Sequence, residues 1–152
     1  MERSRGIVIY GMAIVVFGFY NLLGAGDYGH FKTMFQPLPA FVITGIYFFT
    51  VFYGICGVYC GRKILKLEDW SRKLMVVLTV ISVVSGLALN RIVMANFREF
   101  LQSGNINIPP DMIGPVSSYM VVLTVLITLF EMSVIYYFTR PGVAHQFRAC
   151  KA

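Results

Sequence analysis

Four apolar stretches of about 20 residues or more occupy most of this sequence, and they restrict the chain to folds that cross a lipid bilayer. An α-helix rises about 1.5 Å per residue, so about 20 residues span the ~30 Å hydrocarbon core. The charged share is only 13%, against about 25% in an ordinary soluble domain. The sequence therefore predicts an all-α polytopic membrane protein with four antiparallel transmembrane helices, forming one domain over residues 1–152. The expected helices cover residues 6–23, 38–60, 74–101 and 113–138.

The first stretch follows Arg3 and Arg5, so it has some features of a signal peptide. Its length exceeds the 7–15 residues or so of a typical signal-peptide core, and we therefore expect a retained first helix. The four helices and their connections use nearly the whole sequence, and we expect no separate soluble domain.

The basic residues are distributed asymmetrically. Ten of the thirteen Lys and Arg residues lie near the chain ends or between residues 61 and 73. The other three are Lys32, Arg91 and Arg98. Such an excess faces the cytoplasm, so both termini and the middle connection are predicted to lie inside. Basic clusters at membrane ends also account for the net charge of +6, so we do not expect nucleic-acid binding.

The middle connection, residues 61–73 (GRKILKLEDWSRK), is predicted to lie at the lipid headgroups. The aromatic ring of Trp70 suits the membrane interface. The basic side chains suit contact with anionic lipid phosphates, which we expect as partners together with the bilayer itself. These expected anchors are Arg62, Lys63, Trp70, Arg72 and Lys73.

Glu131 is the most informative residue, because its helix places it deep in the bilayer. It lies nine residues before Arg140, about 13 Å along a helix. An acidic side chain at that depth costs about 2.5–3.5 kcal/mol, so we expect it to be neutral. It is either a proton or cation site or a structural group that joins helices. The second interpretation is favoured because working pathways usually contain several ionisable groups, and no other lies at this depth.

Hydroxyl groups are the expected partners of Glu131. Ser82 has a similar depth, and Ser85 lies one turn further along the same helix. Ser82 also belongs to a stripe of small and polar residues with Thr79, Gly86 and Asn90, which in lipid is typical of a helix-packing face. The second stretch has a comparable packing motif, formed by Gly54, Gly57 and Gly61.

No cofactor or metal site is expected. Cys56 and Cys60 share one helix face, but an unbroken helix gives poor disulfide geometry, and thiols on the cytoplasmic side stay reduced. No histidine lies nearby to complete a zinc site. His30 and His145 lie outside the four stretches, which excludes haem ligation within the bundle.

Two segments resemble a family of small uncharacterised bacterial membrane proteins. One is GRKILKLEDWSRKL at residues 61–74, and the other is YYFTRPGVAHQF at residues 136–147. The resemblance covers about the second half of the chain. It implies the same topology and a bacterial inner-membrane location, and it supplies no site residues.

Three functions remain open at this point. The leading hypothesis is a non-catalytic membrane scaffold or accessory subunit that packs against partner proteins or itself, as a homo-oligomer or within a larger complex. The alternative is a small transporter or ion-conducting oligomer that uses Glu131. A membrane enzyme comes third, because no nucleophile, base and orienting group converge in the sequence.

Overall fold

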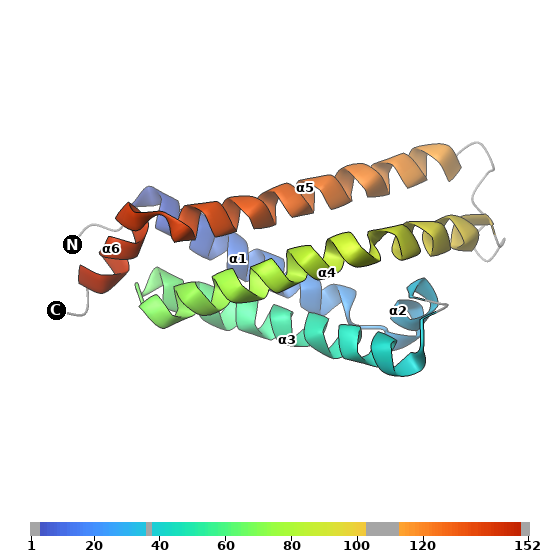
Figure 1. The fold of residues 1–152 in the computed structure, drawn as a ribbon, viewed down its shortest axis with the longest axis horizontal. Helices are drawn as coiled ribbons and strands as arrows, with labels where there is room; N and C mark the ends of the chain where they lie inside the picture. The colour runs from blue at the N-terminus through green and yellow to red at the C-terminus, as the bar shows by residue number, and fades with distance from the viewer. Residues whose placement is uncertain (1–3, 36–37, 103–112, 150–152) are drawn as a thin grey trace.

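The computed structural model describes residues 4–35, 38–102 and 113–149. All regular elements within these residues are helices (Figure 1). They are α1 (Arg5–Gly24), α2 (Tyr28–Met34), α3 (Ala40–Leu65), α4 (Asp69–Gln102), α5 (Ile113–Thr139) and α6 (Pro141–Ala149). Four of them, α1, α3, α4 and α5, are long and apolar enough to cross a membrane. The predicted all-helical membrane-protein class is confirmed at this level.

Two short helices were not expected from the sequence. Helix α2 begins after Asp27, whose side-chain carboxylate accepts a 2.8 Å hydrogen bond from the Gly29 amide. Tyr28 ties α2 to α3 through a 2.9 Å hydrogen bond with Thr44. Helix α6 begins at Pro141, a residue that suits the first position of a helix. Both helices are too short and too polar to give the apolar pattern that marks a membrane span.

The connection between α3 and α4 is much shorter than the predicted loop at residues 61–73. Helix α3 continues to Leu65, and α4 already begins at Asp69. Leu67, two residues after the end of α3, has a positive φ of 61°, a conformation that is rare for a leucine. Its side chain is buried in the core, which offsets the backbone strain. At its other end α4 reaches Gln102, one residue beyond the expected bound of the third helix.

Helices α1 and α3 pack through glycine backbones. A Cβ atom added to Gly18 would lie 2.7 Å from the Val58 nitrogen and 2.8 Å from the Gly54 oxygen. A Cβ on Gly57 would lie 3.1 Å from the Gly18 Cα, and one on Gly61 would lie 3.0 Å from the Gly11 oxygen. Small residues permit such close approach, which is a main source of helix association in lipid. The predicted packing glycines Gly54, Gly57 and Gly61 thus all face α1.

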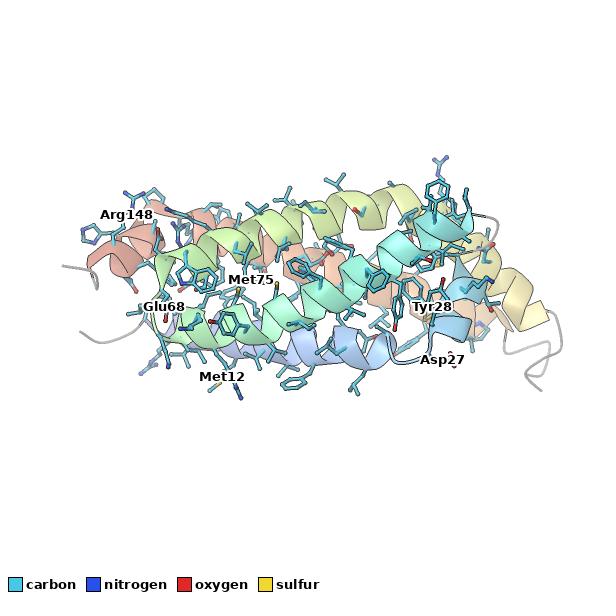
Figure 2. The ribbon with its side chains drawn as sticks, turned by 90° about the horizontal axis from the view of Figure 1, so that it is seen from below. Met12, Asp27, Tyr28, Glu68, Met75 and Arg148 are labelled. Atoms are coloured by element: carbon cyan, nitrogen blue, oxygen red, sulfur yellow. The ribbon has the colours of Figure 1, made fainter. Side chains whose placement is uncertain are left out.

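The end of the molecule that carries α6 holds most of the buried apolar side chains. The α3–α4 connection and the first turn of α1 lie at this same end, which we call the α6 end (Figure 1). The opposite end, with α2, is called the α2 end. Figure 2 shows the labelled Glu68 and Arg148 at the α6 end, and Asp27 and Tyr28 at the α2 end. The core at the α6 end combines Ile7, Ile14, Cys60, Ile64, Leu67, Met75, Leu78, Val134, Phe138, Val143 and Phe147.

Candidate functional site: a buried carboxyl at the floor of an open cavity

Glu131 is buried on α5, with 5% of its surface exposed. The Ser82 hydroxyl on α4 donates a 2.8 Å hydrogen bond to its Oε1 atom. The structure therefore brings together the two residues that the sequence placed at the same depth. This bond joins two helices inside the apolar part of the bundle, where such bonds are typically worth about 0.6–2 kcal/mol.

A second pair of polar groups lies beside the carboxyl. Tyr53 of α3 and Thr79 of α4 are both buried, and their hydroxyls share a hydrogen bond of 3.3 Å. Tyr53, Thr79 and Glu131 together line a small cavity of about 10 Å³. That volume is close to the minimum for one water molecule, and three polar groups suffice to hold it. Helices α3, α4 and α5 therefore meet at one buried polar cluster, which we call the Glu131 cluster: Tyr53, Thr79, Ser82 and Glu131.

Sequence reasoning missed Tyr53. The residue lies four positions before Gly57, so helical spacing places it on the glycine face of α3. That spacing was the available signal. It points a phenol toward the interior, but it does not reveal which residue of α5 the phenol meets.

Two larger cavities extend from the Glu131 cluster toward the α2 end. The first has a volume of about 220 Å³ and reaches Glu131 itself. Its lining comes from α1, α4 and α5: Phe17, Tyr20, Asn21, Ser82, Gly86, Leu87, Asn90, Thr124, Ile127, Thr128 and Glu131. Tyr20 and Leu87 at its edge are more than half exposed, so this cavity is not sealed.

The second cavity has a volume of about 250 Å³ and lies between α3, α4 and α5. It shares Ser82, Gly86, Asn90 and Thr124 with the first cavity. Ser85 lines only this second cavity, on the same helix as Ser82. We call these two spaces together the vestibule. Polar side chains of α4 and α5 line it together with apolar ones. Polar side chains at membrane depth typically face such a cavity rather than lipid.

The vestibule ends at Glu131. On the far side of the carboxyl, toward the α6 end, Met75 and Val134 line the small cavity and belong to the apolar core. Ile7, Cys60, Ile64 and Phe138 fill the space beyond them. In this conformation the described residues close the Glu131 cluster toward the α6 end, and the larger cavities lie on its α2 side.

No cation neutralises Glu131 within the part of the chain that the structure describes. The ion pairs found there involve Glu68 and Asp69 at the α6 end. The other titratable side chains that line the cavities at Glu131 are the phenols of Tyr20 and Tyr53. Among residues 4–35, 38–102 and 113–149, no three His, Cys, Asp or Glu side chains cluster as a metal site requires. The arrangement suits exchange of a proton or a monovalent cation at a single carboxyl.

Gly86 differs from the expected packing role. A Cβ atom on it would meet nothing within 4 Å, because the residue faces the vestibule instead of a neighbouring helix. Its small size widens the cavity. Cys56 and Cys60 are both free thiols, with Cys60 buried in the core.

The expected lipid anchors divide into two groups. Arg62, Trp70 and Lys73 are exposed at the α6 end and remain accessible to headgroups. The Lys63 ammonium and the Trp70 indole N–H both donate to the Glu68 carboxylate, at 2.8 and 2.7 Å. These hydrogen bonds, with that of Lys63 the stronger influence, hold the pKa of Glu68 below its usual range.

Arg72 does not have the position that a lipid anchor needs. Its side chain is buried, and it donates a 2.6 Å hydrogen bond to the Phe138 carbonyl at the end of α5. It also pairs with Asp69 at 2.8 Å, and its guanidinium lies 5.7 Å from the centre of the Phe147 ring of α6. The expectation that Arg72 contacts lipid phosphate is therefore replaced by a structural role that joins α4, α5 and α6.

The fold and this site define a class: an α-helical membrane protein with a buried carboxyl at the floor of a vestibule. No protein-family model, curated protein or solved structure matches the chain. The resemblance of residues 61–74 and 136–147 to small bacterial membrane proteins thus stays an expectation. The site geometry alone has to support a functional proposal.

Proposed function

We propose that the chain is a small membrane transporter or ion-conducting oligomer in which Glu131 is the group that takes up a proton or a cation. One observation carries the proposal. In the described parts of the four long helices, Glu131 is the only buried carboxyl that lies away from the helix ends. It forms the floor of an open cavity that polar side chains help to line. A purely structural glutamate needs hydrogen bonds but no access. Intramembrane carboxyls with access to a cavity typically belong to ion or proton pathways.

The closed α6 side of the vestibule favours a carrier over a continuous pore for a single chain. The core between Glu131 and the α6 end contains apolar side chains in contact with one another. A bound ion could leave toward that end only if the helices rearranged. The two cavities lie between the long helices on the α2 side of Glu131, so this part of the bundle has room to move.

The test is ion flux in proteoliposomes with wild type and Glu131→Gln. Glutamine keeps the size and hydrogen-bonding capacity of the side chain, but it cannot release a proton near neutral pH. We expect a proton or cation flux in wild type that falls to the level of empty liposomes in the variant, with an unchanged thermal unfolding transition. Equal flux in both proteins, or none in either, would contradict the proposal.

A non-catalytic scaffold or accessory subunit is the second candidate, and the large uncovered helix surface favours it. In the most apolar 18 residues of each long helix, at most 22% of the residues are buried inside the chain, and in α4 only 11% are. The remaining surface is available to lipid, a second copy of the chain or a partner. Purification in mild detergent followed by mass spectrometry tests this candidate. A partner retained equally by wild type and Glu131→Gln, with no flux in either, would favour it over transport.

We further propose that successive long helices are antiparallel and that the α6 end faces the cytoplasm, in a bacterial inner membrane. The basic residues Arg62, Lys66, Arg140 and Arg148 support this orientation, since all are exposed at the α6 end. Alkaline phosphatase fused after Ala152 should be inactive, whereas a green fluorescent protein at the same position should fold and fluoresce. Active phosphatase at Ala152 would reverse the orientation.

A further inference from the structure

We propose that the cavity beside Glu131 binds a small organic cation, with the carboxylate as its counter-ion and the rings of Phe17 and Tyr20 against its apolar groups. The inference rests on the proposed function and specifies the class of substrate. It is drawn from the two kinds of wall that this cavity combines, a single acidic group and an aromatic surface.

Among the described residues, Glu131 is the only acidic side chain that lines the cavity. Ser82 donates to Oε1 of Glu131, and the small cavity with Tyr53 lies beside the carboxyl. No lysine, arginine or histidine of the described residues lines either cavity at Glu131. One carboxylate carries a single negative charge, so it can neutralise one monovalent cation. A hard divalent ion would need six or more oxygen ligands.

The aromatic wall lies on α1. Phe17 and Tyr20 both line the 220 Å³ cavity, and their ring centres are 6.3 Å apart in a stacked arrangement. Phe17 also meets Phe130 of α5, with 5.5 Å between ring centres. Ring faces attract cations that carry methyl or methylene groups. A hydrated alkali ion would make no use of this wall, so the combination favours an ammonium with apolar substituents.

The volume and the edge of the cavity limit the ligand further. A volume of about 220 Å³ lies below the range of roughly 300–1,000 Å³ found for drug-sized ligands, so the cation is small. The exposed side chains of Tyr20 and Leu87 border the cavity, so an amphiphilic cation has a route into it.

Binding exchanges a proton for the cation. Before binding, the carboxyl of Glu131 holds its proton, which avoids an unpaired charge at membrane depth. On binding, the O–H bond breaks, the proton leaves through the vestibule to water, and the carboxylate pairs with the ammonium. The net charge of the site is zero both before and after binding, and nothing is oxidised or reduced.

The groups that face the carboxyl are consistent with one titrating site. Helix α1 presents Ile14 and Phe17, and α4 presents Thr79 and Ser82, none of which titrates. The other titratable side chains that line these two cavities are the phenols of Tyr53 on α3 and Tyr20 on α1. One proton per bound cation is therefore expected.

The probe is tetramethylammonium, whose permanent charge removes any proton exchange of its own. Isothermal titration calorimetry of the full chain in lipid nanodiscs should give one saturable site. In buffers of different ionisation enthalpy, the heats should correspond to release of about one proton per cation. Glu131→Gln should abolish the binding. Na⁺ should compete at least tenfold more weakly than tetramethylammonium.

Three variants of α1 separate ring contact from general damage. Tyr20→Leu should weaken tetramethylammonium binding by about 2- to 30-fold, the range that a cation–ring contact is worth. Tyr20→Phe keeps the ring face and should bind as wild type does. Phe19→Leu is the matched control, because Phe19 is exposed and does not line the cavity.

The outcomes separate this inference from the transport proposal. Flux that depends on Glu131, without tetramethylammonium binding or with Na⁺ bound equally well, would overturn the inference and leave transport standing. Equal affinities of wild type and Tyr20→Leu would also overturn it. Proton-linked tetramethylammonium binding without any flux would support the inference and contradict transport.

Discussion

Arg72→Met is expected to lower the free energy of unfolding by about 3–5 kcal/mol, the usual effect of breaking a buried charge pair from one side. Methionine fills similar space but donates no hydrogen bond. Asp69 would keep only its 2.9 Å pair with Lys73, and the Phe138 carbonyl would lose its side-chain donor. Phe147 would lose the cation beside its ring, so α6 should detach more readily.

Lys73→Met is the matched control. Lys73 pairs with the same carboxylate, but its side chain is 62% exposed. Exposed pairs contribute about 0–1 kcal/mol, so this change should have little effect. Unfolding by sodium dodecyl sulfate in mixed micelles, followed by circular dichroism, measures both. Similar losses in the two variants would show that Arg72 has no special role.

Gly18→Ala is expected to destabilise the α1–α3 pair by about 1–3 kcal/mol, the typical cost of overpacking a filled interface. The new methyl group would meet backbone atoms of Gly54, Gly57 and Val58, the nearest at 2.7 Å. A backbone cannot rotate away as a flexible side chain can. The two helices must move apart, which weakens their contact along the whole glycine face.

Gly45→Ala is the control for helix propensity. A Cβ atom at Gly45 of α3 would meet nothing within 4 Å, so the change adds a methyl group without a clash. Alanine is the better helix former by about 1 kcal/mol, and this variant should be neutral or slightly more stable. The same micelle titration serves here. Loss of stability at Gly45 equal to that at Gly18 would argue against the close-packing explanation.

The sequence was most informative where a residue's depth in a helix decided its partners. The hydrogen bond between Ser82 and Glu131 could be anticipated because both positions were counted from helix ends that basic residues mark. Close approach at Gly57 could be anticipated because small residues at a spacing of four form one face. Both arguments use only the geometry of a single helix.

The sequence was less informative where the arrangement of several helices decides the outcome. Arg72 belongs to a basic cluster, and only its contacts with Phe138 and Phe147 distinguish it from Lys73. Gly86 belongs to the same kind of stripe as Gly57, yet it borders a cavity. The vestibule itself depends on how far the helix pairs separate, and no spacing rule within one helix contains that information.

Trp70 has a consequence for spectroscopy. It is the one tryptophan of the chain, so intrinsic indole emission reports on the α3–α4 connection at the α6 end. Its N–H donates to Glu68, whose pKa lies below the usual value of about 4.3 for glutamate. That carboxylate therefore stays ionised throughout the neutral range. A change in emission on ligand addition between about pH 6 and 8 would record displacement of this connection, not titration of its hydrogen-bond partner.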